Sequence, residues 1–293
     1  AHAVETIQEL AKQDKPFYLA VGFLKPHLPF NSPKKYWDLY DRSKIQVPDF
    51  KQWPEAAPSF AGSNWGELRN YKDMPKSDLL TDEQAKELIH GYYASVSFTD
   101  ANIGKVIDEL ERQGLRDSTV IVVWGDHGWK LGDYGAWCKH TNFEIDTHVP
   151  LIVSMPKAAG NGKKSDALVE FVDIYPTLAD LAGLDLPAHL EGTSFAPVLD
   201  DPAMQWKTAS FSQYPRSQGK TRLMGYTCRS GDWRLTRWVN RSNPTEEIAV
   251  ELYDVSKTDT PQKNLADNPE YKAVLEKMLE INRAGWQAAK PKP

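Results

Sequence analysis

Apolar residues recur at two spacings along the chain, and the spacing predicts the type of each element. Helical spacing occurs over residues 3–13 and again after residue 81. Thr81 and Gln84 have the spacing of a capping box that opens the second helix, and Gly114 marks its predicted end. A further helix is predicted over about residues 166–183. These helices are candidates to cover the faces of a sheet.

Short apolar runs between the helices predict strands at residues 17–22, 119–124 and 149–153. Each run ends in polar residues next to glycine or proline. Strands that alternate with helices are typical of a parallel sheet with covered faces. We therefore predict an α/β fold with a mostly parallel sheet covered by helices over residues 1–204.

The pattern changes at about residue 205, where short strand candidates follow one another with turns between them. A helix at about residues 268–288 closes the chain. We predict a small C-terminal antiparallel α+β subdomain over residues 205–293. Its strand candidates are residues 208–213, 223–229, 233–239 and 250–255.

Composition excludes some classes of function and leaves others open. The 293 residues are 41% hydrophobic, which is enough for a substantial core. The net charge of −5 gives no basic surface for nucleic acid, and no apolar run is long enough to span a membrane. Ten Trp and twelve Tyr fit either core packing or a sugar-binding cleft.

The two cysteines, Cys138 and Cys228, have neither C-x-x-C nor zinc-type spacing, which favours two buried thiols over a disulfide. The chain opens at Ala1 without an initiating Met or a signal peptide. We expect it to be an internal part of a larger protein.

Asp126 and His127 follow a predicted buried strand and lie between Gly125 and Gly128. The glycines permit a sharp turn that brings both side chains to one ion. The alternative is a strand-end turn in which Asp126 caps a backbone amide. A hard cation such as calcium takes six to eight mostly oxygen ligands, so further carboxylates would have to come from elsewhere.

His27 and Lys139 are the other candidates for chemistry. His27 lies between two prolines after a predicted strand, where it could act as a general acid or be an ordinary loop histidine. Lys139 lies in a loop rich in glycine and aromatic residues, where it could hold an anionic oxygen or be a solvated surface lysine.

Several motifs occur in an order that resembles sulfatases of the iduronate-2-sulfatase type, in the alkaline-phosphatase superfamily. K-P-H-x-P-F, D-H-G-W-x-L-G, W-x-K and T-H-V-P-L-I begin at Lys25, Asp126, Trp137 and Thr147. Further motifs lie in the predicted subdomain, at residues 212–216, 224–226 and 251–254.

The resemblance implies a mechanism in which a cysteine converted to formylglycine attacks the sulfur of a sulfate ester. A calcium ion polarises the sulfate, a histidine protonates the leaving alcohol, and lysines bind sulfate oxygens. Asp126 and His127 match the metal-binding pair of this family. His27 matches its active-site histidine, and Lys139 matches its sulfate-contacting lysine.

The chain departs from the family pattern because neither Cys138 nor Cys228 lies in C-x-[PS]-x-R, and the family's paired aspartates are missing. We expect an N-terminal segment or chain of the same sulfatase to supply both, so this chain alone is expected to be incomplete. Tyr134 also stands where close relatives can carry a histidine.

The predicted function is a sulfuric-ester hydrolase that acts on a sulfated sugar, such as a 2-O-sulfated uronate of a glycosaminoglycan. The alternatives are a phosphatase or phosphodiesterase of the same superfamily and a non-enzymatic sugar-binding module. Few cysteines and a single sequon at Asn240 favour a periplasmic or secreted protein, lysosomal if eukaryotic.

Overall fold

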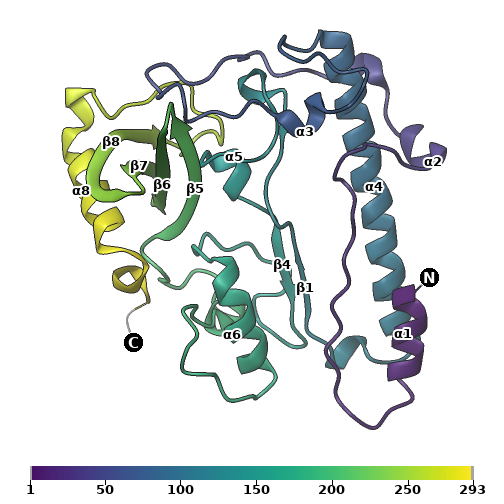
Figure 1. Ribbon diagram of the computed structural model, residues 1–293. Helices are drawn as coiled ribbons and strands as arrows, with labels where there is room; N and C mark the ends of the chain where they lie inside the picture. Colours follow the sequence, from purple (N-terminus) through teal and green to yellow (C-terminus); the bar gives the residue numbers. More distant parts are fainter. Residues whose placement is uncertain (1, 292–293) are drawn as a thin grey trace. The chain divides into compact units, whose positions relative to one another are not determined.

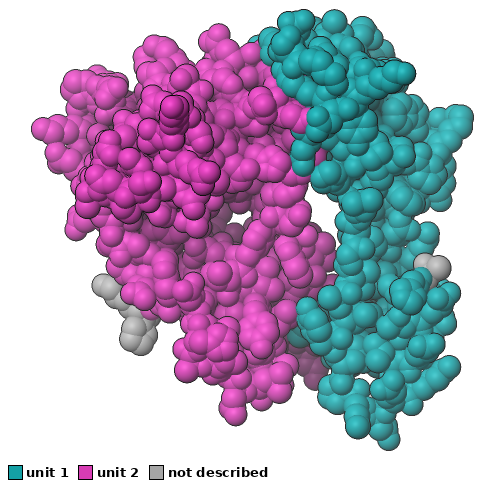
Figure 2. Space-filling view, in the orientation of Figure 1, with its two compact units in different colours: residues 1–49, 67–120 teal, residues 50–66, 121–293 magenta. Residues whose placement is uncertain are grey.

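The computed structural model describes residues 2–291, which pack as two compact units (Figure 2). One unit consists of the chain up to residue 49 together with residues 67–120. The other consists of residues 50–66 together with the chain from residue 121 onward. The predicted boundary at residue 204 lies within the second unit and stays a prediction.

The first unit is built on one long helix, α4 (Asp82–Arg112), against which α1 and α2 pack (Figure 1). The predicted capping box is confirmed, because Thr81 Oγ1 accepts the Gln84 amide at 3.3 Å and Gln84 Oε1 accepts the Thr81 amide at 3.0 Å. Gly114, with a φ of +69°, follows its end as predicted. The shorter helices are α1 (His2–Leu10), α2 (Lys34–Trp37), η1 (Arg42–Lys44), α3 (Gly66–Arg69) and η2 (Arg116–Ser118).

Residues 17–22 were predicted to form a strand and do not pair in a ladder within the described residues. Their side chains alternate between half-buried and exposed, which is the period of an extended chain with one covered face. The alternating burial matches the sequence pattern, but the predicted strand does not form within residues 2–291.

The mostly parallel sheet that the sequence predicts is not found in the described residues. Strands β1 (Ile121–Trp124) and β4 (Leu151–Ser154) pair antiparallel, with Ile121 opposite Ser154. The segment between them holds only a short hairpin and a one-turn helix, so no helix carries the chain across the sheet as a parallel pair requires. This segment contains β2 (Lys130–Leu131), η3 (Asp133–Gly135), β3 (Trp137–Cys138) and α5 (Glu144–Thr147).

After β4, helices α6 (Phe171–Leu181) and α7 (Ala196–Asp200) form a small core from Ile174, Phe195 and Val198. A buried ion pair supports this region, because Lys207 Nζ lies 2.7 Å from Asp173 Oδ2.

The antiparallel strands predicted near the C-terminus are confirmed as a four-stranded sheet in the order β5-β6-β7-β8 (Figure 1). Helix α8 contacts β6 and β7, and its Met278 packs with Cys228, Leu235 and Leu252 in the buried core. The elements are β5 (Ser210–Gln218), β6 (Thr221–Ser230), β7 (Trp233–Asn240), β8 (Asn243–Asp254), η4 (Pro269–Tyr271), α8 (Lys272–Ala284) and η5 (Trp286–Ala289).

Both cysteines are buried, and neither forms a disulfide in the described part of the chain. Among the helices of residues 2–291, none combines the length and the apolar content needed to cross a bilayer.

A carboxylic side chain is enclosed in the second unit. Glu251, on β8, accepts the Trp238 indole N–H at 2.6 Å and the Tyr253 hydroxyl at 2.5 Å. Burial raises the pKa of Glu251, although both hydrogen bonds oppose the rise. Folding therefore favours the protonated acid.

We expect Glu251 to lower the free energy of unfolding as pH rises. A carboxyl group whose folded pKa is raised contributes its full stability below the unfolded pKa of about 4.3 and loses it as pH rises through the folded value. The free energy of unfolding of the full-length protein should thus fall more steeply above about pH 4.3 than that of Glu251→Gln. Denaturant unfolding across pH measures both profiles, and parallel profiles would contradict the assignment.

Candidate functional site

The candidate site in the second unit starts at the end of β1. The Gly125 amide donates to the Pro150 carbonyl at 3.1 Å, and the Gly128 amide donates to the Asp146 carbonyl at 2.9 Å. A Cβ on Gly128 would collide with the carbonyl oxygen of Ile145, so only glycine permits this approach. The turn that carries Asp126 and His127 is therefore held against the segment before β4.

Asp126 and His127 lie together at this turn, as the sequence predicts. Asp126 Oδ2 is 3.6 Å from His127 Nε2, and the side chains are 85% and 30% exposed. His127 Nδ1 lies 2.9 Å from the Gly128 carbonyl, an arrangement in which Nδ1 carries the hydrogen and donates it. In that tautomer the Nε2 lone pair faces the carboxylate, and both groups can offer an atom to one cation.

A carboxylate oxygen and an imidazole nitrogen 3.6 Å apart can bind the same metal ion, so this pair can form part of a metal site. A second cluster in the described residues consists of Glu144, His148 and Asp259, whose ligand atoms lie within 4.8 Å of one another. Glu144 already accepts hydrogen bonds from two arginines, and their positive charges oppose a cation there.

Lys139 is only 8% exposed, so it is not a solvated surface lysine. The residues on either side, Cys138 and His140, have φ values of +66° and +78°. Such left-handed backbone is uncommon for residues other than glycine, and it occurs often at functional sites. Lys139 Nζ lies 4.7 Å from the centre of the Trp129 ring.

Trp129 links the predicted site residues, because its ring also stacks on His127 with 5.8 Å between ring centres. The structure thus brings Asp126, His127 and Lys139 into one contiguous group within the second unit. His27 belongs to the first unit, and its expected place beside the other three residues stays a prediction.

His27 lies in a loop that α4 supports, since Thr99 donates a hydrogen bond to the Lys25 carbonyl at 3.0 Å. The peptide bonds before Pro26 and Pro29 are both cis. His27 Nδ1 lies 3.0 Å from the Leu28 carbonyl. His27 Nε2 is 3.8 Å from the Glu67 carboxylate, so the ring is oriented from two sides.

Two residues near the site have structural roles that the sequence alone did not reveal. Arg216 donates from Nε to the Gly62 carbonyl at 2.9 Å and also contacts the His140 carbonyl. Tyr134 is buried, and its hydroxyl donates to the Pro261 carbonyl at 3.1 Å. Tyr134 is therefore a core residue, and Arg216 clamps the loop after Lys139.

The small sheet holds the same loop through buried charge. Arg234, on β7, donates to the Asn142 carbonyl at 2.5 Å and to Glu144 Oε2 at 2.8 Å. Arg229, on β6, donates to Glu144 Oε1 at 3.0 Å. Burial lowers the pKa of Arg234, and the charge of Glu144 opposes this shift. No sequence motif indicates this network, because its members are up to about ninety residues apart.

Comparison with known proteins identifies the class of protein. The sulfatase family matches residues 1–184, and the C-terminal region of N-sulphoglucosamine sulphohydrolase matches residues 132–284. The chain belongs to the sulfatase family.

Particular relatives refine this result. The chain is similar to iduronate 2-sulfatase of Homo sapiens, with 32% identity over 84% of this chain and 56% of that protein. It is similar in fold to a protein solved with its substrate D-glucosamine-2-N,6-O-disulfate, with 22% identity over 96% of this chain and 68% of that chain, at a TM-score of 0.77. Phosphonate monoester hydrolase of Agrobacterium radiobacter is 25% identical over 96% of this chain and 59% of that one, at a TM-score of 0.73. The chain thus spans little more than half the length of the human relative.

We expect the Arg234–Glu144 pair to dominate the stability of the loop. Arg234→Met removes a hydrogen bond to a charged group, which typically costs about 1.5–3 kcal/mol, while Arg229 still pairs with Glu144. Arg234→Met should therefore lower the free energy of unfolding of the full-length protein by about 1.5–3 kcal/mol. Arg283→Met is the matched control, since Arg283 is exposed and pairs with Glu247 at the surface. Its effect should stay within about 0.5 kcal/mol. Denaturant unfolding measures both, and equal losses would contradict the role of burial.

Proposed function

We propose that the full-length protein is a sulfuric-ester hydrolase that removes sulfate from a sulfated sugar. Within this chain, Asp126 and His127 bind the metal ion, Lys139 binds the sulfate group, and His27 protonates the leaving oxygen. The observation that carries the proposal is the contiguous group of Asp126, His127 and Lys139 around Trp129, in a chain of the sulfatase family.

The proposed metal is calcium, which would polarise the sulfate group when bound. The exposed carboxylate of Asp126 and the Nε2 atom of His127 supply two ligands. Calcium takes six to eight mostly oxygen ligands, so the remainder come from other residues. We propose that they belong to the N-terminal segment that also carries the formylglycine nucleophile, as the family resemblance implies.

Lys139 supplies a fixed positive charge for the sulfate oxygens. Its side chain is almost enclosed and rests on the Trp129 ring, so the ammonium group is restrained before substrate binds. A preorganised charge stabilises developing negative charge better than one that must reorganise first. This restraint supports an electrostatic role rather than proton transfer.

His27 is the proposed proton donor to the sugar oxygen. Histidine is the side chain whose ordinary proton exchange occurs near neutral pH. With Nδ1 donating to the Leu28 carbonyl, the proton on Nε2 of the imidazolium form is the one available to the leaving oxygen. The resemblance to the family's active-site histidine supports the assignment.

The proposed substrate is a 2-O-sulfated uronate of a glycosaminoglycan or a related polysaccharide. Support comes from the motifs shared with iduronate-2-sulfatases and from the similarity to the human protein of that name. The shared motifs and the similarity to the human iduronate 2-sulfatase together favour a uronate over other sulfated sugars. We further propose that the protein is periplasmic or secreted, or lysosomal if its source is eukaryotic.

Exposed apolar side chains support the proposal that a further segment of the same sulfatase covers this chain. In the second unit, Ile152 of β4 is 62% exposed and Trp124 of β1 is 43% exposed. Phe171, Val172 and Tyr175 of α6 are also exposed. Phe171, Val172 and Tyr175 are neighbours on α6, and a covering segment would bury this group of apolar side chains together.

A phosphatase or phosphodiesterase of the same superfamily is the second candidate, favoured by the similarity to a phosphonate monoester hydrolase. Such enzymes usually rely on two metal ions held by several histidines and aspartates. Relative turnover of a sulfate ester and a phosphonate monoester by the full-length protein decides between the two activities.

Asp126→Asn should weaken calcium binding, because the substitution removes a charged ligand. Isothermal titration of calcium into the metal-free full-length protein measures this, and the dissociation constant should rise at least about tenfold. Asp133→Asn serves as the control, since Asp133 accepts the Leu131 amide within the hairpin. Equal affinities of Asp126→Asn and the wild type would remove Asp126 from the metal site.

The roles of His27 and Lys139 predict different responses to the leaving group. A positioned acid contributes about 10²–10⁴-fold when the departing alcohol needs a proton. His27→Ala should therefore lower kcat strongly with a sulfated sugar and much less with nitrophenyl sulfate, whose phenolate leaves without help. Lys139→Ala should impair both substrates, because both carry the same sulfate.

The assay is kcat and kcat/KM of both variants on both substrates in the full-length enzyme. Equal losses for His27→Ala on the two substrates would remove its role as acid. Unchanged kinetics of Lys139→Ala would show that this lysine does not contact the sulfate.

A further inference from the structure

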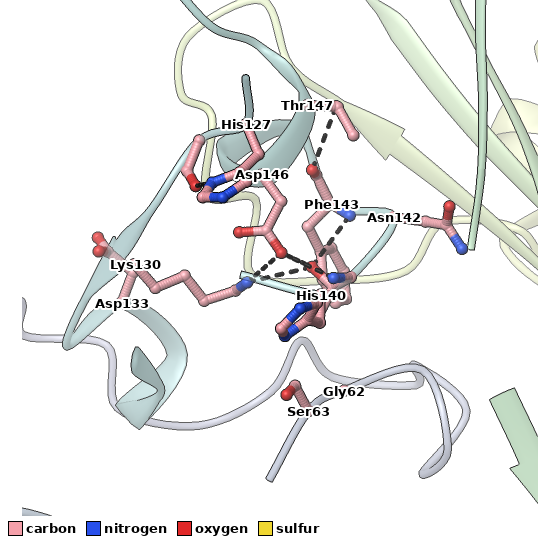
Figure 3. Close-up of polar contacts among 12 residues, drawn as sticks. Gly62, Ser63, His127, Lys130, Asp133, His140, Asn142, Phe143, Asp146 and Thr147 are labelled. Atoms are coloured by element: carbon pink, nitrogen blue, oxygen red, sulfur yellow. Dashed lines mark hydrogen bonds and ion pairs between the residues drawn. The ribbon is translucent and has the colours of Figure 1, made fainter. Parts of the chain in front are cut away.

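The structure contains a buried lysine that none of the proposed roles uses. Lys130 lies on β2, and its side chain is 0% exposed. Its Nζ atom donates to Asp146 Oδ2 at 2.5 Å and to Thr141 Oγ1 at 3.1 Å (Figure 3). Burial lowers the pKa of Lys130, and the Asp146 charge opposes the shift. Lys130 and Asp146 therefore form an ion pair that solvent does not reach.

Asp146 connects this pair to the loop of Lys139. Its Oδ2 atom accepts the Thr141 amide at 2.8 Å and the Thr141 hydroxyl at 2.5 Å. Thr141 is two residues after Lys139, in the stretch where Cys138 and His140 have left-handed backbone. The Asp146 carboxylate thus fixes the end of the Lys139 loop, where two non-glycine residues have an unfavourable left-handed backbone.

The backbone of Asp146 connects the same point to the turn of Asp126 and His127. The Asp146 carbonyl accepts the Gly128 amide at 2.9 Å. The missing side chain of Gly128 is what lets the turn approach this close. One residue therefore holds both the turn with the proposed metal ligands and the loop with the proposed sulfate ligand.

A buried ion pair is a costly way to stabilise a protein. An apolar pair of similar volume is often as stable or more stable, since desolvation offsets the attraction. Asp146 Oδ1 is buried and lacks a hydrogen-bond partner among the described residues, which adds to the cost. A gain in positional accuracy explains the pair better than a gain in stability does.

We infer that Lys130 and Asp146 are positioning residues, which set the place of Lys139 relative to the turn of Asp126 and His127. This inference rests on the proposed sulfatase function. Lys130 does not touch the substrate. Its ammonium group orients the Asp146 carboxylate, and Asp146 in turn holds Thr141 and the loop before it.

A double-mutant cycle in the full-length enzyme tests the inference. Lys130→Met should lower kcat/KM for nitrophenyl sulfate by about 10–100-fold, the usual range for residues that orient ligands. If Lys130 acts through Lys139, the same substitution in the Lys139→Ala enzyme should change kcat/KM by less than about twofold. Losses that multiply in the double variant would overturn the inference.

Lys207→Met is the matched control, because Lys207 is also buried and paired with an aspartate, Asp173. Both single variants should lower the melting temperature, and activity is compared where each is fully folded. Only Lys130→Met should lose activity per folded molecule. An equal loss in Lys207→Met would show that the effect is general destabilisation, and would overturn the inference.

A second variant keeps the test decisive if Lys130→Met does not fold. Lys130→Met combined with Asp146→Leu removes both charges and should recover part of the melting temperature lost in Lys130→Met. Activity should stay low, since the Thr141 amide has lost its acceptor. Recovery of wild-type activity together with stability would overturn the positioning role.

The outcomes separate this inference from the proposed function. A wild-type enzyme without sulfatase activity, or a Lys139→Ala enzyme with unchanged kinetics, refutes the proposed function and the inference with it. If Lys139→Ala loses activity and Lys130→Met lowers kcat/KM of that variant as much as it lowers that of the wild type, only the inference is refuted.

Discussion

The second unit depends on the ion pairs of two buried carboxylates, which lie in the segment between Lys139 and β4. Glu144 and Asp146 are two residues apart and almost fully enclosed, so each needs a cation of the protein. Arg234 reaches Glu144 from the small sheet, and Lys130 reaches Asp146 from the hairpin. The connection between β1 and β4 can adopt its irregular path because these charges replace the hydrogen bonds of a regular element.

The contrast with Asp126 explains the electrostatics of the site. Asp126 carries an exposed carboxylate that lies beside a histidine, whereas Glu144 is paired with two arginines. A divalent cation gains most where negative charge is not already neutralised. This difference supports the Asp126–His127 pair as the metal ligands over the cluster of Glu144, His148 and Asp259.

The sequence correctly predicted the elements whose hydrogen bonds form between residues close together in the chain. The capping box at Thr81, the helical spacing of α4 and the strands of the small sheet were all confirmed. Antiparallel pairing of β1 and β4 was missed, because apolar runs of four residues carry no information about direction. Residues 17–22 were predicted as a strand from the same kind of run, and they form no strand within residues 2–291.

For the site, the sequence by itself determined which residues are adjacent along the chain: Asp126 beside His127, and a lysine in the glycine-rich loop that follows. Family membership came from the order of such motifs. Only the tertiary structure decided that Trp129 joins His127 to Lys139 and that Lys130 meets Asp146. The physical reason is that burial and charge pairing depend on segments brought together by packing, and sequence spacing does not encode which distant cation will neutralise a buried carboxylate.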